Sequence, residues 1–339
     1  MMASSDFGID LGSSSILVCQ KGAGICYNEP SILAVDERTG EVIYSGKKAY
    51  SIMGRTPRYI KTIYPLQKGV IHDFKLATEL LTIAMKKVCD NKMIRPRVAI
   101  CVPSSSTKVE AKAAAEAVIA AGARGAYLVE EPLAAALGAD MDIMKPRGQM
   151  VMDIGGGVTD IAILSLGGVV GKSSIKYGGS YFDELVARYI RSAYNLNIGE
   201  KTAEIVKIKI GSIFMERGDE NPEMTVKGIN VLSGLPGKAR VKRSEIATVL
   251  SEAFEKVLPD IFLTLEQMPP ELIADIYDEG IVITGGSAML HGMDKFITRV
   301  FRTNARVAPN PINCVAKGTV KTFNYKYELQ MGYFGPQSE

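Results

Sequence analysis

Residues 150–164 read Met-Val-Met-Asp-Ile-Gly-Gly-Gly-Val-Thr-Asp-Ile-Ala-Ile-Leu, and residues 7–18 repeat the pattern as Phe-Gly-Ile-Asp-Leu-Gly-Ser-Ser-Ser-Ile-Leu-Val. Each copy is an apolar run with an aspartate near its end, a turn of small residues and a second apolar run. Short apolar runs joined by Gly and Ser are typical of β-hairpins. The sequence therefore predicts one such hairpin in each half of the chain, with Asp10 and Asp153 beside the two turns.

The two predicted turns suit a phosphate group and a metal ion. Most phosphate loops run from a strand into a helix, whose N-terminus holds the anion, whereas these turns would offer hairpin amides from two sides of one nucleotide. The carboxylates of Asp10 and Asp153 are ligands of the kind that a hydrated Mg²⁺ takes. A single Asp-x-Gly turn is weak evidence because both residues are ordinary in turns. Two matched copies make coincidence a poor explanation.

A third motif lies near the C-terminal end, where residues 280–290 read Gly-Ile-Val-Ile-Thr-Gly-Gly-Ser-Ala-Met-Leu. The pattern predicts a buried strand, a Gly-Gly turn and a helix from about Ser287 to Phe301. Glycine permits close approach of the backbone to a flat ligand such as a purine ring. A purely structural strand-to-helix turn explains this motif equally well when it is taken alone.

Composition limits the class of protein. The 339 residues predict roughly two domains, and 47% hydrophobic with 23% charged residues is ordinary for a soluble globular chain. The net charge of +3 is too small to indicate nucleic-acid binding, and no apolar run approaches the ~18 residues of a membrane span. The five cysteines show no Cys-x-x-Cys spacing, so we expect free thiols, with Cys19 and Cys101 buried.

Strands and helices alternate between the two hairpins, which favours α/β layers. Thr107 and Glu110 form a predicted capping box at the start of an alanine-rich helix that ends near Ala121. The other predicted elements of this stretch are strands at 98–102 and 126–129 and a helix at 133–138. The tail at 313–330 has a helical pattern.

The order of the three motifs resembles that of the ATPase superfamily of actin, sugar kinases and heat-shock chaperones. Within it, the chain resembles the bacterial actin family MreB/Mbl over nearly its whole length. The stretches that carry this closer resemblance are Asn28-Glu29-Pro30-Ser31, Gly54-Arg55-Thr56-Pro57, Pro65-Leu66, Gly69-Val70-Ile71, Val129-Glu130-Glu131-Pro132, Ile198-Gly199-Glu200-Lys201-Thr202-Ala203-Glu204, Ser233-Gly234-Leu235-Pro236 and Pro269-Pro270-Glu271-Leu272.

This resemblance implies an actin-like ATPase fold, in which two related domains with ribonuclease-H-like cores flank a nucleotide cleft. Domain I would comprise residues 1–145 with 314–339, and domain II residues 146–313. Each would carry a small inserted subdomain, at about 32–64 in domain I and about 182–243 in domain II.

The resemblance also implies the cofactors ATP and Mg²⁺, with the metal held by Asp10 and Asp153 through water. The implied phosphate-binding residues are Asp10, Gly12, Ser13, Ser14, Ser15, Gly155, Gly156 and Gly157. The implied nucleoside-binding residues are Glu204, Lys207, Gly285, Gly286, Ser287 and Met289. Glu204 and Lys207 are spaced to share one helix face, so an exposed ion pair on a charged helix is the alternative interpretation.

Glu131 matches the family carboxylate that polarises or positions the attacking water, and Thr159 and Asp153 are the other expected catalytic residues. The alternative for Glu131 is a glutamate at a helix N-terminus that the helix dipole stabilises. If the alignment with the family is shifted by one residue, the neighbouring Glu130 takes this catalytic role instead.

Residues 90–97 read Asp-Asn-Lys-Met-Ile-Arg-Pro-Arg, which places Met93 and Ile94 among three basic side chains. Peripheral membrane proteins bind anionic lipid through apolar residues that are flanked by Lys and Arg. The alternative is that Met93 and Ile94 pack onto their own domain.

The function implied is that of a cytoplasmic, ATP-binding cytoskeletal protein with slow ATPase activity. Its subunits would add head to tail in paired protofilaments that lie peripherally on the inner face of the cell membrane. These filaments would organise the cell-wall elongation machinery and rod shape. No nucleic-acid partner is expected. One alternative is a small-molecule kinase of the same fold, which needs a dedicated acceptor site. The other is a chaperone ATPase, which needs a substrate-binding domain.

Overall fold

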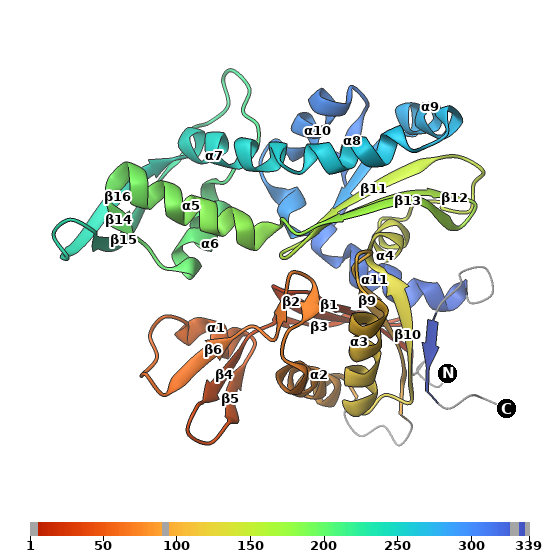
Figure 1. Ribbon diagram of the computed structural model, residues 1–339, viewed down its shortest axis with the longest axis horizontal. Coiled ribbons are helices and arrows are strands. Elements are labelled where there is room, and N and C mark those ends of the chain that lie inside the picture. Colours follow the sequence, from red (N-terminus) through yellow and green to blue (C-terminus); the bar gives the residue numbers. More distant parts are fainter. Residues whose placement is uncertain (1–5, 90–94, 326–331, 336–339) are drawn as a thin grey trace.

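Two β-sheets that share a five-strand topology, one of them extended by β19, form the framework of the computed structural model, which describes residues 6–89, 95–325 and 332–335 (Figure 1). The first sheet has the order β19-β10-β9-β1-β2-β3 and contains β1 (Asp6–Leu11), β2 (Ser15–Gln20), β3 (Gly24–Pro30), β9 (Arg97–Val102), β10 (Gly125–Glu130) and β19 (Gly332–Phe334). The second has the order β13-β12-β11-β17-β18 and contains β11 (Gln149–Ile154), β12 (Thr159–Ser165), β13 (Gly168–Ile175), β17 (Ile281–Thr284) and β18 (Ala305–Val307).

The second half of the chain repeats the connections of the first. In each sheet a three-stranded antiparallel meander continues into two further strands that run parallel to its first strand. Parallel neighbours require a crossover, which α3 (Lys108–Ala120) provides from β9 to β10 and α10 (Met293–Phe301) provides from β17 to β18. The predicted α/β class with two related cores is confirmed.

Two short helices join the halves. These are α4 (Glu131–Gly138), which follows β10, and α11 (Cys314–Lys321), which follows β18. A Cβ atom on Gly138 would lie 1.8 Å from the carbonyl oxygen of Cys314, and one on Gly318 would lie 1.7 Å from that of Ala134. Because both positions are glycine, the helix backbones can touch, and one apolar cluster extends from α4 and α11 into both sheets.

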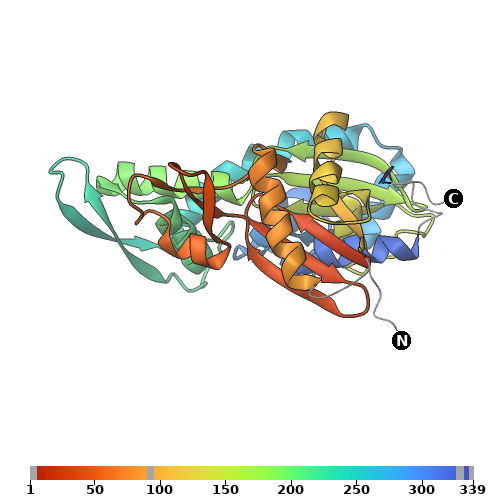
Figure 2. The same cartoon turned by 90° about the horizontal axis from the view of Figure 1, so that it is seen from below.

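Each half also carries a small three-stranded sheet. The first consists of β4 (Leu33–Asp36), β5 (Glu41–Ser45) and β6 (Ile60–Ile63), with α1 (Lys47–Ile52) beside it. The second consists of β14 (Leu196–Asn197), β15 (Glu223–Asn230) and β16 (Pro236–Lys242), among α5 (Gly179–Tyr194), α6 (Glu200–Ile210) and α7 (Arg243–Glu255). Figure 2 shows the β15–β16 hairpin projecting at the end of the molecule far from both termini.

The remaining elements cover the two halves. They are β7 (Leu66–Gln67), β8 (Val70–Ile71), α2 (Phe74–Val88), α8 (Leu258–Glu266), α9 (Pro270–Glu279) and the 3₁₀ turns η1 (Gly286–Met289), η2 (Pro311–Asn313) and η3 (Thr322–Asn324). Within the described residues, no helix has the length and apolar character needed to cross a bilayer.

Several local predictions are confirmed. Thr107 and Glu110 form the capping box, in which the Thr107 amide donates to the Glu110 carboxylate at 2.7 Å and the Glu110 amide donates to Thr107 Oγ1 at 3.2 Å. Cys19 and Cys101 are buried free thiols. In the tail, α11 and η3 account for the helical pattern as far as Asn324, and the pattern beyond 325 lies outside the described residues.

The predicted helix start at Ser287 is wrong. The chain forms the 3₁₀ turn η1 at Gly286–Met289, and α10 begins only at Met293. Gly292 lies between them with a φ of 75°, a left-handed conformation that interrupts a right-handed helix. The predicted lipid-binding residues Met93 and Ile94 lie outside the described residues.

Candidate functional site

The two predicted hairpins are confirmed, and their turns have the same geometry. The Gly12 amide donates to the Ser15 carbonyl at 3.1 Å, and the Gly155 amide donates to the Val158 carbonyl at 2.9 Å. The turns face each other closely, since a Cβ atom on Gly156 would lie 2.0 Å from Ser14 Oγ. A side chain at Gly156 would therefore displace the Ser14 side chain in this arrangement of the turns.

A cavity of about 30 Å³ lies between the two turns. Its lining includes Asp10, Gly12 and Ser13 from the first half, Glu131 at the start of α4, and residues 155–158 from the second turn. Ser13 Oγ accepts a hydrogen bond from the Gly69 amide at 2.8 Å. The volume suits one or two water molecules, so a triphosphate group requires the two turns to move apart.

Three of the predicted site residues carry carboxylates at or near this cavity: Asp10 and Glu131 line it and are half-buried, and Asp153 is buried beside the second turn. Burial and the nearby Asp153 raise the pKa of Asp10 to about 8. Burial raises the pKa of Asp153 to about 6, although the Thr284 hydroxyl donates to its Oδ1 at 2.6 Å and acts in the opposite direction. Burial also raises the pKa of Glu131 well above its usual range, with Asp160, Asp153 and Asp10 adding to the effect. The site therefore concentrates negative charge that a cation would stabilise.

Asp160 is a fourth carboxylate that the sequence analysis did not include in the site. It lies directly opposite Asp153 in the β11–β12 hairpin and is fully buried. Its Oδ1 accepts from the Ser104 amide at 3.1 Å, and burial raises its pKa to about 7. Among the charges near Glu131, that of Asp160 has the largest effect on the Glu131 pKa. The predicted hairpin itself points to Asp160, because the two residues of a directly opposed pair, here Asp153 and Asp160, have side chains on the same face.

The structure separates the two adjacent glutamates. Glu131 is the first residue of α4 and lines the cavity. Glu130 instead pairs with Lys172 at 2.7 Å on a partly exposed surface. Of the two candidates, Glu131 lines the cavity and Glu130 does not. The Thr159 hydroxyl donates to the Tyr177 carbonyl at 2.8 Å, which leaves its oxygen as an acceptor.

The helix α6 places Glu204 and Lys207 on one face, but they do not pair with each other. Glu204 accepts a hydrogen bond from the Tyr50 hydroxyl of α1, in the other half of the chain. Lys207 donates to the Gly179 carbonyl and to Asp183 Oδ2, each at 2.9 Å. Asp183 was also missed by the sequence analysis. Burial raises its pKa to about 6, and no described group donates to its buried Oδ1.

The Gly285-Gly286 turn lies beside the second hairpin. Ser287 Oγ donates to the Gly155 carbonyl at 3.4 Å, and a Cβ atom on Gly285 would lie 2.4 Å from the Ile154 carbonyl oxygen. Met289 is exposed at the end of η1. The third sequence motif therefore adjoins the second, as expected of one continuous site.

The Tyr50–Glu204 bond predicts a measurable competition. If Glu204 binds the nucleoside through Oε2, the oxygen that now accepts from the Tyr50 hydroxyl, then the ligand competes with that hydroxyl. Removing the hydroxyl in Tyr50→Phe should tighten ATP binding by about fivefold, since a net hydrogen bond contributes about 1 kcal/mol. Equilibrium titration with a fluorescent ATP analogue measures this. Tyr64→Phe is the matched control, because the Tyr64 hydroxyl contacts the Met53 sulfur instead; weaker binding of Tyr50→Phe would contradict the prediction.

A family model described as MreB/Mbl protein matches residues 4–331 of this chain. The chain is 43% identical to the cell shape-determining protein Mbl of Bacillus subtilis (strain 168) over 319 residues, which cover 94% of this chain and 95% of that protein. It is 42% identical to the cell shape-determining protein MreB of Escherichia coli (strain K12) over 323 residues, covering 94% and 92%.

Solved structures give the same result. The crystal structure of MreB5 of Spiroplasma citri bound to ADP superimposes with a TM-score of 0.90 at 38% identity, covering 95% of this chain and 97% of that one. The MamK double helical filament, at 21% identity, shares the fold with a TM-score of 0.76 over 94% of this chain and 98% of its own. The motifs, the repeated sheet topology and these matches agree, and the chain belongs to the MreB/Mbl family.

Proposed function

We propose that this protein is an ATP-binding cytoskeletal protein that polymerises head to tail and hydrolyses ATP slowly. The observation that carries the proposal is the pair of matched turns, which face each other across a cavity lined by the carboxylates of Asp10 and Glu131. The MreB5 structures with ADP and with AMPPNP support a nucleotide in this cleft. The domains would be residues 1–145 with 314–339, and residues 146–313.

The residues fit a magnesium nucleotide. Asp10 and Asp153 supply oxygen ligands, and their pKa values are raised because burial disfavours the charged carboxylates, which a bound cation would stabilise. Among the described residues, no three His, Cys, Asp or Glu side chains form a ready-made metal site, so the two aspartates would hold Mg²⁺ through water. Bound Mg²⁺ would offset the charge of the phosphates. The groups that would cradle the phosphates are the amides and hydroxyls of Gly12, Ser13, Ser14, Ser15, Gly155, Gly156 and Gly157.

Hydrolysis in this site would depend on positioning and electrostatics, as in other phosphoryl transfers. Glu131 would orient the attacking water, and the Thr159 oxygen would accept from it. Glu204 and Lys207 would bind the nucleoside on one side. Gly285, Gly286, Ser287 and Met289 would bind it on the other.

Sedimentation tests the proposal. Purified protein should pellet with ATP and Mg²⁺, without any added phosphoryl acceptor, and stay in the supernatant without nucleotide. A small-molecule kinase would hydrolyse or transfer phosphate only with an acceptor and would not pellet. Protein that binds ATP yet remains soluble at all concentrations would contradict the filament assignment.

The proposal extends to the cell membrane. We infer that the filaments form paired protofilaments in the cytoplasm, on the inner face of the cell membrane, and organise cell-wall elongation and rod shape. The relatives whose names describe cell-shape determination support the role in cell shape. The segment proposed to insert in lipid contains Met93 and Ile94.

Replacing both residues with serine should release filaments from liposomes without preventing polymerisation. Withdrawing one large side chain from lipid costs roughly 1.5–3 kcal/mol of binding free energy if it was fully buried. This loss adds up over the many subunits of a filament. Co-sedimentation with anionic liposomes at high salt measures the binding. If the double variant binds as well as the parent, attachment lies elsewhere; if it fails to fold, the two residues belong to the core.

A further inference from the structure

Lys201, at the start of α6, reaches across to the end of α1 in the other half of the chain. Its Nζ atom donates to the Tyr50 carbonyl at 2.8 Å and to the Ser51 carbonyl at 3.4 Å. The same ammonium lies 4.5 Å from the centroid of the Tyr50 ring, which is a cation–π distance. One cation therefore makes three contacts with one short helix of the opposite half.

The end of α1 suits a cation that comes from outside the helix. The last carbonyl groups of a helix have no partner within it, and they carry a partial negative charge that a cation stabilises. The last turn of α1 contains no basic residue that could interact with them. Lys201 supplies this missing positive charge from the other half.

The Tyr50 side chain forms a second bond between the same two helices. Its hydroxyl donates to Glu204, three residues beyond Lys201 on α6. Burial, together with this hydrogen bond, raises the pKa of Tyr50 above its usual range, so the phenol keeps its proton and remains a donor at neutral pH. Lys201 and Glu204 are spaced to share one face of α6, and Tyr50 contacts both of them.

These contacts lie on the side of the molecule away from the helices that join the halves. In Figure 1, α1 and α6 lie at the left and α4 and α11 lie to the right of the centre, with the turns of the β1–β2 and β11–β12 hairpins between them. The two halves are therefore connected on both sides of the turns, by packed helices on one side and by side chains on the other.

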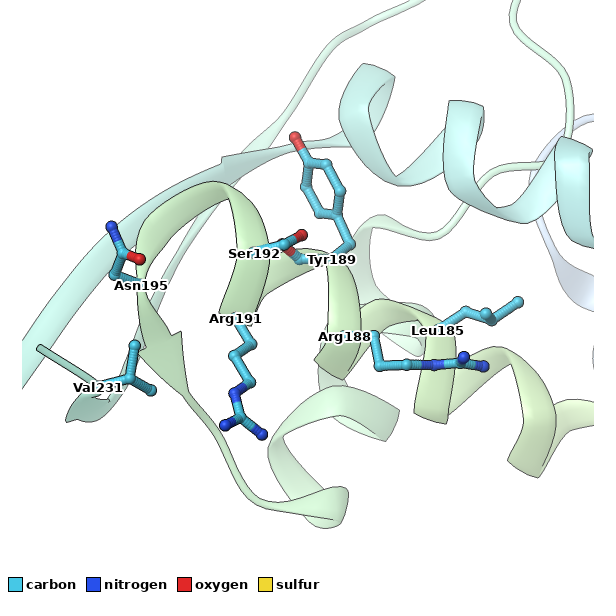
Figure 3. Close-up of a pocket in the computed structure, with 7 residues that line it drawn as sticks. All are labelled: Leu185, Arg188, Tyr189, Arg191, Ser192, Asn195 and Val231. Carbon is cyan, nitrogen blue, oxygen red and sulfur yellow. The ribbon is translucent and has the colours of Figure 1, made fainter.

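The connection closes the space that a nucleotide needs. The cavity between the turns has a volume of about 30 Å³, whereas pockets for small-molecule ligands have about 300–1,000 Å³. A nucleotide must therefore separate the two halves to reach both turns, and this movement breaks the contacts of Lys201 and Tyr50. The hollow of about 650 Å³ on α5, which includes Arg188 and Arg191 (Figure 3), is a separate feature that shares no lining residue with this cavity.

We propose that Lys201 and the end of α1 form a latch across the mouth of the nucleotide cleft, and that opening of this latch limits how fast a nucleotide enters and leaves. The proposal rests on the proposed function, because it concerns exchange of the nucleotide that the two turns would hold. Lys201 contacts main-chain carbonyls of α1, which a nucleoside bound to Glu204 leaves in place. The latch therefore re-forms over a bound nucleotide, whereas the Tyr50 hydroxyl competes with it.

The test is Lys201→Met in the full chain, which removes the ammonium and keeps a long side chain beside the Tyr50 ring. Stopped-flow mixing with a fluorescent ATP analogue and Mg²⁺ gives the association rate constant, and a chase with excess ATP gives the dissociation rate constant. Both should rise by about tenfold, the low end of the effect of losing a hydrogen bond to a charged group. The Kd should stay within about threefold of the parent, because the latch closes the free and the loaded protein alike.

Three further variants separate the latch from other effects. Lys209→Met is the matched control, since Lys209 is an exposed lysine of the same helix, and its rate constants should equal those of the parent. Lys201→Arg should keep slow exchange, because a guanidinium also donates to carbonyls and stacks on an aromatic ring. Tyr50→Phe keeps the ring and the carbonyl, so it should raise the association rate constant and leave dissociation unchanged.

Three results would overturn the proposal. In the first, Lys201→Met has the rate constants of the parent, so this contact does not limit exchange. In the second, only dissociation is faster and affinity falls by the same factor, which makes Lys201 a nucleotide ligand. In the third, Lys209→Met speeds exchange as much as Lys201→Met, so the effect is one of general charge. A parent that does not bind the analogue would instead contradict the proposed ATP binding, and the latch with it.

Discussion

Asp153→Asn should reduce Mg²⁺-dependent ATP hydrolysis by about 100-fold or more, the range seen when an electrostatic group of an active site is removed. Asp153 lies at the end of β11, and the Thr284 hydroxyl holds its Oδ1 at 2.6 Å. Asparagine preserves the shape and an oxygen acceptor for Thr284 but removes the charge that would hold the metal. Steady-state phosphate release at saturating Mg²⁺ and ATP measures the effect.

The same substitution has a predicted effect on stability that checks the fold. Burial raises the pKa of Asp153 to about 6, above the value of about 3.9 in an unfolded chain. The folded state therefore binds the Asp153 proton more tightly than the unfolded chain does. As pH rises from about 4 to 6, ionisation of this carboxyl lowers the free energy of unfolding, and above about pH 6 this stability has been lost in full. Without metal at about pH 8, Asp153→Asn should therefore be at least as stable as the parent in thermal unfolding.

Asp140→Asn is the matched control, because Asp140 is an exposed carboxylate paired with Lys321 at the surface. It should leave hydrolysis within about twofold of the parent. If Asp153→Asn is folded and also stays within about twofold, then the second hairpin is not the metal and phosphate site.

Glu131→Ala should slow hydrolysis by about 10- to 1000-fold while leaving ATP affinity nearly intact. Glu131 lines the cavity between the two turns, where it can orient a water but is not needed to hold the nucleoside. Filaments should still form with ATP and should persist longer, since the bound nucleotide is consumed more slowly. Single-turnover hydrolysis, equilibrium nucleotide binding and the lifetime of sedimentable filaments measure the three quantities separately.

The neighbouring glutamate supplies the control for this experiment. Glu130→Ala removes a carboxylate that pairs with Lys172 at the surface, so hydrolysis should remain within about twofold of the parent. If Glu130→Ala is slow and Glu131→Ala is not, the roles are reversed. Loss of affinity together with turnover in Glu131→Ala would mean that Glu131 has a structural role.

Local patterns were sufficient for several elements. The two hairpins follow from apolar runs on either side of Gly and Ser turns, and the start of α3 follows from the Thr107–Glu110 capping box. Both signals involve residues only a few positions apart. The start of α10 was mispredicted for a local reason as well, because the left-handed backbone of Gly292 interrupts an otherwise continuous helical pattern.

The sequence by itself determined the α/β class, the repeated Asp-Gly hairpins and the family, because these depend on the order and spacing of residues along the chain. Only the tertiary structure decided which distant groups meet. It placed Asp160 near Glu131 and brought the Tyr50 hydroxyl to the Glu204 carboxylate. These contacts depend on how the two sheets pack around α4 and α11, where backbones touch at Gly138 and Gly318. Pairings across so many residues leave no periodic signal in the sequence.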